Sequence, residues 1–306
     1  MPVVVFSPAK LNLFLAITGR RSDGFHELVS VVVTVDFGDT LWMEAEAPKS
    51  GEQGAGSRRA AFGLACSDPA LAVDDSNLVV RAARLFAETT GWRDDVRFSL
   101  QKRIPMGAGL GGGSSNATAT LRGLNMIAGR PLKAEALAGL AAQLGSDCPL
   151  FLQEAPVVMR GRGERVEVLP AAAASRLAGR RVLIFKPDIS INTAWAYRRL
   201  AQAAPGSYLP PGEAEARLQA WMDDATAPAE ALLFNNLEAP AFAKFLALPT
   251  LLAQLKSEYG LAPRMSGSGS ACYALLPDGV PTAAVTAAIR AAWGPAAFVT
   301  EARIRG

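Results

Sequence analysis

Pro105-Met-Gly-Ala-Gly-Leu-Gly-Gly-Gly-Ser-Ser-Asn116 carries the strongest structural signal in this chain, because five glycines and two serines stand between a strand-like run and a helix-like run. Glycines let successive backbone N–H groups turn toward one anion, and a helix that follows adds the positive end of its dipole. The stretch is not a Walker A sequence, since Gly112 is followed by Gly113 and Ser114. It predicts a phosphate-binding loop whose countercharge comes from elsewhere in the chain.

The flanks of the loop predict the order strand, loop, helix. Residues 96–100 alternate apolar and polar side chains, as a half-buried strand does. After the loop, small and apolar residues recur at helical spacing, namely Ala117, Leu121, Leu124 and Ala128. Gly129 and Pro131 predict the end of this helix, and residues 132–144 predict a second helix that Gly145 closes.

The rest of the chain predicts an α+β protein with two domains. Further strands are expected at residues 1–10, 29–35, 157–159, 181–185, 272–276 and 298–304, and further helices around 217–222 and 250–259. Strands and helices alternate without a regular βαβ period, which disfavours a doubly wound sheet. Because 306 residues exceed the usual size of one core, we expect domains at 1–172 and 173–306, joined near the low-information stretch at 170–175. Residues 205–212 predict a loop, and 51–60 a disordered insertion.

Composition indicates a folded, cytoplasmic protein. Half of the residues are apolar, and the net charge of +3 comes with no basic run that would indicate nucleic acid. Cys66, Cys148 and Cys272 are odd in number and far apart, which argues against a disulfide framework or a CxxC metal site and favours small buried residues. The N-terminus lacks a basic segment before its short apolar stretch, and no apolar run approaches the roughly 18 residues of a membrane span.

Several other residues are candidates for chemistry. Met265-Ser-Gly-Ser-Gly-Ser-Ala271 is either a strand-entry turn or a second backbone cradle that closes with the first loop on one anion, while Gly161-Arg-Gly-Glu164 is typical of a hairpin turn. Lys10 lies among apolar neighbours, where an ammonium needs a carboxylate or phosphate partner. Asp147 is the candidate partner, the alternative being an exposed turn aspartate.

His26 is the only histidine, which excludes a triad with two imidazoles and a multi-histidine zinc site. It is either structural or, together with Phe25, a pair that stacks on and hydrogen-bonds a planar ring. Ser114 and Ser115 stand where the helix after the glycine loop should begin. They are either N-caps or supply a hydroxyl to phosphate or Mg²⁺, and both roles can coexist.

These residues together resemble a family. The glycine loop and Ser-Gly-Ser-Gly at 266–269 are similar to motifs of the kinases that act on galactose, homoserine, mevalonate and phosphomevalonate. Five further markers resemble the branch that phosphorylates the 2-hydroxyl of 4-diphosphocytidyl-2-C-methyl-D-erythritol with ATP, in non-mevalonate isoprenoid biosynthesis. They are Pro8-Ala-Lys-Leu-Asn-Leu13, Asp23-Gly-Phe-His26, Asp36-Phe-Gly-Asp39, Ser76-Asn-Leu-Val79 and Gly145-Ser-Asp-Cys-Pro149. The markers span residues 7 to 276, and the resemblance implies a two-domain kinase with ATP and substrate in the cleft between the domains.

The resemblance also implies roles for individual residues. Asp147 would accept the proton of the attacking hydroxyl, and Lys10 would keep that aspartate ionised. Mg²⁺ would accompany ATP, with Ser114 or Ser115 as candidate ligands and no other metal site. The residues expected around ATP are Pro105, Met106, Gly107, Ala108, Gly109, Leu110, Gly111, Gly112, Gly113, Ser114 and Ser115 at the phosphates, with Asn77 and Lys102 near the adenosine. The first domain would be the ATP-binding domain, and the second would contribute to the substrate site.

The residues expected around the cytidine-linked substrate are Asn12, Phe25, His26, Thr193, Tyr197, Gly267 and Ser268. Two rings would sandwich the cytosine while His26 bonds its edge. Many members of the family have tyrosine where this chain has Phe25, so one hydroxyl is lost while the stacking face remains. We expect a modest effect on affinity.

Two alternatives remain open at this point. A related kinase of homoserine or mevalonate would explain the loops but not Phe25 and His26. A non-catalytic nucleotide- or RNA-binding protein would explain the aromatic pair but has no use for Lys10 and Asp147. The expected partner is a small molecule, with no nucleic acid and no membrane.

Overall fold

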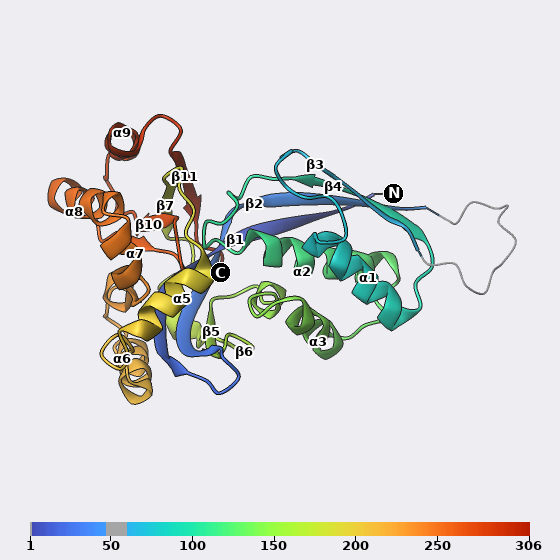
Figure 1. The fold of residues 1–306 in the computed structure, drawn as a ribbon, viewed down its shortest axis with the longest axis horizontal. Coiled ribbons are helices and arrows are strands. Elements are labelled where there is room, and N and C mark those ends of the chain that lie inside the picture. Colours follow the sequence, from blue (N-terminus) through green and yellow to red (C-terminus); the bar gives the residue numbers. More distant parts are fainter. Residues whose placement is uncertain (1, 47–59) are drawn as a thin grey trace, which may run out of the picture. The chain divides into compact units, whose positions relative to one another are not determined.

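Figure 1 shows a computed structural model of the chain, which describes residues 2–46 and 60–306. The chain forms two compact units. Unit 1 consists of Met1–Ala9, Gly38–Ile104 and Gly111–Leu152, and unit 2 of Lys10–Phe37, Pro105–Leu110 and Gln153–Gly306. Two long strands contribute residues to both units, β1 (Val3–Arg20) and β2 (His26–Glu46). The insertion expected at 51–60 lies outside the described residues as far as residue 59.

Unit 1 is a small sheet with helices packed against it. The end of β2, from Thr40 to Glu46, pairs antiparallel with β4, and β3 pairs parallel with β4. β4 alternates buried Val96, Phe98 and Leu100 with outward polar residues, as its sequence predicts. The other elements of this unit are β3 (Phe62–Cys66), α1 (Leu78–Thr90), β4 (Asp95–Gln101), α2 (Gly112–Ile127), α3 (Ala134–Leu144) and the 3-10 turn η1 (Pro149–Leu152). Their apolar faces share one core with β2.

Unit 2 contains the β5–β6 hairpin and a four-stranded antiparallel sheet in the order β11-β7-β10-β9. The start of β2 pairs with β5, and β1 pairs parallel with β8 through Phe14 and Phe234. Its strands are β5 (Val157–Gly161), β6 (Arg165–Val168), β7 (Arg181–Lys186), β8 (Phe234–Asn235), β9 (Arg264–Met265), β10 (Cys272–Leu275) and β11 (Phe298–Arg303).

The helices of unit 2 are α4 (Ala171–Ala174), α5 (Thr193–Gln202), α6 (Pro211–Asp223), the 3-10 turn η2 (Ala229–Leu232), α7 (Glu238–Lys244), α8 (Ala247–Tyr259) and α9 (Thr282–Trp293). Of these, α5, α7, α8 and α9 share one apolar core with this sheet, in which Phe185, Leu248 and Ile289 are fully buried. Within the described ranges, none of the helices has both the length and the apolar character that a membrane crossing requires.

Several strands and helices were predicted close to their observed ends. Strands expected at 96–100, 157–159, 181–185, 272–276 and 298–304 and the helix expected at 132–144 are present, with ends that differ by at most two residues. The strands expected at 1–10 and 29–35 were predicted too short, because β1 and β2 are 18 and 21 residues long. The turn at 161–164 joins β5 to β6, with Gly161 and Gly163 at positive φ. The stretch expected to join two domains at 170–175 is instead mostly the short helix α4, and the loop expected at 205–212 ends in the first turn of α6. Cys148 and Cys272 are buried as expected, and Cys66 is half-buried.

Candidate functional site

The first half of the glycine loop, Pro105–Leu110, is bound to the second glycine cluster inside unit 2. The Ser266 hydroxyl donates to the carbonyl of Gly109 at 3.1 Å, and the N–H of Ala271 donates to the carbonyl of Ala108 at 3.0 Å. Gly109 has a φ of +76°, and a Cβ there would lie 2.2 Å from the carbonyl oxygen of Ser266. Only glycine fits such a close approach of two backbones. The two glycine clusters therefore converge, as the sequence suggested.

Lys10 lies beside this junction on β1. Its N–H donates to the carbonyl of Leu110 at 3.0 Å, and its side chain is 4% exposed and donates to the Oδ1 atom of Asn12. A Cβ on Gly267 would be 3.2 Å from the Lys10 Nζ atom and 3.3 Å from the Asn12 Oδ1 atom. The ammonium therefore lies against the backbone of the second glycine cluster. A buried ammonium at this position gives unit 2 a positive charge beside two glycine-rich backbones.

Asn12 is itself held in one orientation. Its Nδ2 atom donates to the Ser30 hydroxyl at 2.9 Å, and that hydroxyl donates to the carbonyl of Phe14 at 2.6 Å. Its carbonyl accepts from the Tyr273 hydroxyl at 2.9 Å. Because every polar group of the side chain has a partner, the amide oxygen is directed at Lys10.

Thr193 and Ser268 also meet inside unit 2. Thr193 is the first residue of α5, and its hydroxyl hydrogen-bonds with the Ser268 hydroxyl at 2.8 Å. α5 is capped by Asn192, whose Oδ1 atom accepts from the N–H of Trp195 at 2.8 Å. The second glycine cluster is thus tied both to the start of the glycine loop and to the start of α5.

The second half of the glycine loop begins α2 in unit 1. The helix starts at Gly112, and Gly111 with a φ of +71° is its N-cap, so Ser114 and Ser115 lie inside the first turn and are not caps. The first N–H groups of a helix have no partner within it, which makes this end suited to an anion. The Ser115 hydroxyl is 1% exposed and accepts from the Ser7 hydroxyl at 2.8 Å, whereas Ser114 is half-buried.

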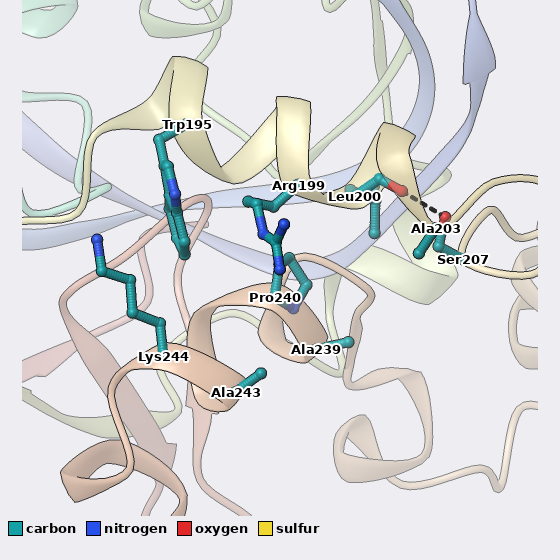
Figure 2. Close-up of a pocket in the computed structure, with 9 residues that line it drawn as sticks. All are labelled: Trp195, Arg199, Leu200, Ala203, Ser207, Ala239, Pro240, Ala243 and Lys244. Atoms are coloured by element: carbon teal, nitrogen blue, oxygen red, sulfur yellow. Dashed lines mark hydrogen bonds between the residues drawn. The ribbon is translucent and has the colours of Figure 1, made fainter.

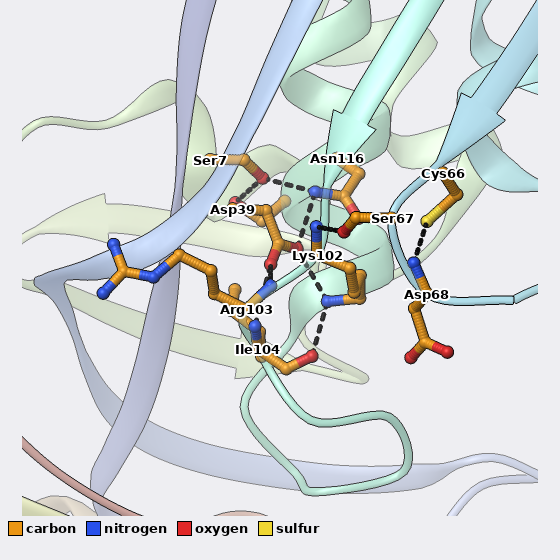
Figure 3. A network of polar contacts seen from close by, with 10 residues as sticks. Ser7, Asp39, Cys66, Ser67, Asp68, Lys102, Arg103, Ile104 and Asn116 are labelled. Atoms are coloured by element: carbon orange, nitrogen blue, oxygen red, sulfur yellow. Dashed lines mark hydrogen bonds and ion pairs between the residues drawn. The ribbon is translucent and has the colours of Figure 1, made fainter. Parts of the chain in front are cut away.

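Figure 3 shows the polar network under this helix, centred on the fully buried carboxylate of Asp39. One carboxylate oxygen accepts from the N–H groups of Arg103 at 2.7 Å and Ile104 at 2.8 Å. The other accepts from the Lys102 ammonium at 2.7 Å and the Asn116 amide at 3.0 Å. Asp39 therefore fixes the residues just before the glycine loop and one residue of the helix just after it.

The marker Asp36-Phe-Gly-Asp39 contains a glycine because a side chain at position 38 would collide with β1. A Cβ on Gly38 would lie 2.3 Å from the carbonyl oxygen of Ser7 and 2.8 Å from the Cα of Pro8. The bare backbone lets β2 approach β1 closely at this point, directly before the buried Asp39. Gly38 and Asp39 of this marker are thus structural requirements of unit 1. Asp36 belongs to unit 2, where its carboxylate accepts a hydrogen bond from the N–H of Arg303 at 2.7 Å.

Lys102 combines a structural role with a position at the start of α2. Its side chain is 5% exposed and also donates to the carbonyl of Ile104 at 2.6 Å. A Cβ on Gly112 would lie 3.0 Å from its Nζ atom. The cation is thus close to the first turn of α2, with Asp39 as its counterion. Asn77, the other residue expected near adenosine, is the N-cap of α1 and accepts from the N–H of Val79 at 2.9 Å.

Asp147 lies in the turn that follows α3, and this turn is anchored to α2. The carbonyl of Cys148 accepts from the Thr118 hydroxyl at 2.8 Å, and the Cys148 thiol hydrogen-bonds with Ser114. Burial raises the pKa of the Cys148 thiol to about 11, so this thiol stays neutral at physiological pH. Asp147 is half-buried and is the only charged side chain between Gly145 and Pro149. Unit 1 therefore holds the turn that contains Asp147 against the first turns of α2.

His26 lies in unit 2 between two tyrosine rings. Its ring centroid is 5.0 Å from that of Tyr197 and 6.1 Å from that of Tyr208. The Nε2 atom is buried and has no hydrogen-bond partner in the part of the chain that the structure describes. Burial and then the positive charge of Arg20 lower the pKa of the imidazole. A neutral imidazole with an unpaired buried nitrogen is suited to the polar edge of a planar ligand.

Phe25 is half exposed and lies under a cation. The Arg162 guanidinium is 5.0 Å above its ring centroid, and the Phe25 N–H donates to the carboxylate of Asp23 at 3.1 Å. Sequence reasoning missed Arg162 and Tyr208. Arg162 stands in the turn predicted at 161–164, which was a signal for its exposure. Tyr208 stands in an irregular loop without periodicity, and nothing in the sequence linked it to His26.

Family models match both parts of the chain. Residues 77–154 match the N-terminal domain of the GHMP kinases, and residues 216–295 match the C-terminal region of the same kinases. The first match contains the glycine loop and Asp147. The second match contains the glycine cluster at 265–271.

Proteins of known name are similar over most of the chain. A 4-diphosphocytidyl-2-C-methyl-D-erythritol kinase of Prochlorococcus marinus (strain MIT 9313) is 39% identical over 284 residues, which cover 90% of this chain and 85% of that protein. A crystal structure of 4-(cytidine 5'-diphospho)-2C-methyl-D-erythritol kinase is 33% identical, with a TM-score of 0.74 over 98% of this chain and 99% of the other. A homoserine kinase from Cytophaga hutchinsonii is 18% identical with a TM-score of 0.73, over 99% and 95% of the two chains, and shares the fold.

Proposed function

This chain belongs to the 4-diphosphocytidyl-2-C-methyl-D-erythritol kinase family of the GHMP kinases, and we propose that it transfers the γ-phosphoryl group of ATP to the 2-hydroxyl of 4-diphosphocytidyl-2-C-methyl-D-erythritol. The O–H bond of the substrate and the bond from the γ-phosphorus to the bridging oxygen break, and a new P–O bond forms. The products are the 2-phosphate, ADP and one proton. This is the reaction expected of a GHMP small-molecule kinase in non-mevalonate isoprenoid biosynthesis.

One observation carries the choice of substrate within the superfamily, namely the unpaired Nε2 atom of His26 between the rings of Tyr197 and Tyr208. A cytosine has a planar face for stacking and an edge with hydrogen-bond donors and acceptors. Homoserine and mevalonate have neither, so they would leave the buried nitrogen unpaired. Phe25, the residue before His26, adds a half-exposed ring that lies under the Arg162 guanidinium.

Asp147 is proposed as the group that accepts the proton of the attacking hydroxyl. Its turn is fixed by the bonds from Thr118 and Ser114 to Cys148, which keeps the carboxylate at the first turns of α2. Positioned general bases are worth roughly 10²–10⁴ in rate. Lys10 is proposed to stabilise negative charge during the transfer, because its buried ammonium lies against the second glycine cluster.

The phosphates of ATP are proposed to bind along Pro105–Ser115. The bare N–H groups at the start of α2 and the positive φ of Gly107, Gly109 and Gly111 support this role. Lys102 and Asn77 stay predicted neighbours of the adenosine. For Lys102, the buried pair with Asp39 supports instead a role in holding the loop.

The residues at the start of α2 fit Mg²⁺ that arrives with ATP. Mg²⁺ is commonly held by substrate phosphates, water and only one or two protein oxygens. Of the two serines in the first turn, Ser114 is the better candidate, because the Ser115 hydroxyl is buried and paired with Ser7. When bound, Mg²⁺ would neutralise phosphate charge during the transfer. A carboxylate cluster for a metal is absent from the described residues.

ADP release measured with purified protein and 4-diphosphocytidyl-2-C-methyl-D-erythritol tests the proposal, with homoserine and mevalonate as matched acceptors. We expect turnover with the cytidine substrate and none with homoserine or mevalonate. Turnover with homoserine or mevalonate would instead support the related kinases. RNA binding with a steep salt dependence and no ATP turnover would support a non-catalytic protein.

Asp147→Asn should reduce kcat at least a hundredfold while the fold and the affinity for the cytidine substrate are kept, because the amide cannot accept the proton. Asp278→Asn is the matched control, since Asp278 is exposed and outside both glycine clusters. Steady-state kinetics and calorimetric substrate binding measure the two quantities. An unchanged kcat in Asp147→Asn would remove Asp147 from the proton transfer.

Two further predictions concern the location of the protein and its domains. We propose that the enzyme works in the cytoplasm, where ATP is available, and that its folding domains divide near residue 172.

A further inference from the structure

A surface pocket of about 620 Å³, open to solvent on one side, lies between α5 and α7 in unit 2, and Figure 2 shows the side chains that line this cavity. Its volume is in the range of small-molecule sites. The lining is mostly apolar, and the polar or charged members are two cations and one serine. The lining residues are Trp195, Arg199, Leu200, Ala203, Ser207, Ala239, Pro240, Ala243 and Lys244.

The charges of this cavity are all of one sign. Arg199 extends from α5 and Lys244 from α7, on opposite walls (Figure 2). Neither cation has a carboxylate partner in the described part of the chain, and no acidic side chain lines the cavity. Arg199 donates to the Gln202 side chain at 2.8 Å, and the Lys244 ammonium lies 4.5 Å from the centre of the Trp195 ring. In Figure 2 the Trp195 ring stands between the Arg199 guanidinium and the Lys244 ammonium, so the two cations flank this ring, and their unbalanced positive charge favours a phosphate headgroup.

The same helix that lines the cavity also carries residues of the cytidine site. Trp195 and Arg199 are four residues apart and lie on one face of α5, while Thr193 and Tyr197 are also four apart. The two pairs are offset by two residues, which is about 200° around the helix. Trp195 therefore faces the cavity, and Tyr197 on the other side packs against His26.

A second connection runs through the loop after α5. Ser207 lines the cavity and donates its hydroxyl to the carbonyl of Leu200 at 2.6 Å, which ties the loop to α5. The next residue, Tyr208, packs edge-on against His26. A ligand that moves α5 or this loop must therefore move one of the rings beside His26.

We propose that the α5–α7 cavity binds a small organic phosphate with an apolar body, and that its occupancy changes the affinity of the His26 site for cytidine nucleotides. The apolar body lies against Trp195, Leu200 and Pro240, and the phosphate lies at Arg199, with the Lys244 ammonium on the other side of the Trp195 ring. The second part of this proposal, the coupling half, is the effect on cytidine affinity; it rests on the proposed function, because it assumes that cytidine binds at His26. The first part, the binding half, is the binding of the organic phosphate and does not depend on that function.

Hexyl phosphate is the probe for the binding half, measured by titration calorimetry and by tryptophan fluorescence. A saturating non-hydrolysable ATP analogue is present so that the glycine loop is filled. We expect one saturable site per chain, with affinity at least tenfold higher than for 1-hexanol or inorganic phosphate alone. Equal binding of 1-hexanol, or no saturation, would overturn the proposal.

Charge-removing variants locate the site. Arg199→Gln and Lys244→Gln should each weaken hexyl phosphate binding at least tenfold, and Trp195→Phe should abolish the fluorescence response. Lys256→Gln removes the same charge from an exposed position on α8 and should bind like the wild type. Unaltered affinity in both Arg199→Gln and Lys244→Gln would place the ligand elsewhere and overturn the proposal. Concentration-dependent self-association that Lys244→Gln abolishes, without hexyl phosphate binding, would mean that a second copy fills the cavity.

The coupling half is read from CMP affinity with and without saturating hexyl phosphate. We expect at least a threefold shift in the wild type and none in Lys244→Gln. An unshifted CMP affinity would overturn the coupling. A chain that binds hexyl phosphate but no CMP would contradict the proposed function, while the binding half would stand.

Discussion

His26 is half-buried against two tyrosine rings, and its buried Nε2 atom has no hydrogen-bond partner in the described residues. An unsatisfied buried polar atom costs about 1–3 kcal/mol, and a ligand with a matching edge removes that cost. The contact of His26 with Tyr197 was expected, because the family resemblance placed both at the cytosine. Phe25 stays a predicted stacking partner of the ligand, and its ring lies under the Arg162 guanidinium. Tyr208 and Arg162 could not be predicted, since their positions depend on how a loop and a hairpin turn lie beside β2.

The single imidazole should titrate below its ordinary pKa of 6.5, because burial and then Arg20 disfavour the protonated form. The unfolded chain then binds more protons than the folded chain below this pH. The contribution of His26 to the free energy of unfolding is therefore complete above pH 6.5 and declines as pH falls toward the lowered pKa. NMR titration of the one histidine ring measures it directly. Arg20→Gln should move the pKa upward, and an apparent pKa above 6.5 in the wild type would contradict the assignment.

His26→Ala should raise the KM for the cytidine substrate about tenfold with little change in kcat, because one hydrogen bond and a ring contact are lost. Steady-state kinetics with each substrate varied in turn separates the effects. Tyr208→Phe is the matched control, since it keeps the ring against His26. A rise in the KM for ATP alone would put His26 at the nucleotide instead.

At the level of elements, α2 shows what sequence periodicity can and cannot predict. The apolar repeat from Ala117 onward predicted a helix, but the helix begins at Gly112. Glycine and serine have low helix propensity, so propensity alone does not predict a helix that starts at Gly112. The conformation of the glycine loop, with Gly111 as N-cap, determines where α2 begins. α1 was missed although Asn77 caps it and Val79, Ala83 and Phe86 are buried at helical spacing. α9 was missed because its alanine-rich sequence has little contrast between faces.

Asp39→Asn should lower the free energy of unfolding by about 3–5 kcal/mol, because the buried Lys102 ammonium loses its counterion. Chemical denaturation followed by circular dichroism measures the change. Asp36→Asn is the control, since Asp36 is exposed and should cost far less. Asp39→Asn combined with Lys102→Met should recover part of the loss. A double variant no more stable than Asp39→Asn would show that the pair is not the source.

For the whole molecule, the sequence predicted the α+β class and the superfamily through its two glycine clusters and five markers. Apolar runs of β-branched residues identify strands because burial selects them locally. How β1 and β2 pass through both units could not be predicted. β2, for example, pairs with β5 in unit 2 and with β4 in unit 1. The sequence suggested that Pro105–Leu110 and the cluster at 265–271 converge, but the individual backbone contacts that join them, about 160 residues apart, could not be predicted from it.

Because Lys102 is buried in the folded chain, acetylation of its amine can be used to follow unfolding. An acetylating reagent needs a free, deprotonated amine, and the Lys102 Nζ atom is buried with two acceptors, whereas Lys133 is exposed. In the folded chain we expect Lys133 to be acetylated at least ten times faster than Lys102, as measured by mass spectrometry of the two peptides. Across a denaturant series, Lys102 labelling should rise at the same midpoint as the loss of circular dichroism. Equal rates at the two lysines in the folded chain would mean that the Lys102–Asp39 pair opens without unfolding. If Lys102 is protected, its acetylation can serve as a stability assay in cell extracts or inhibitor screens, with no added dye.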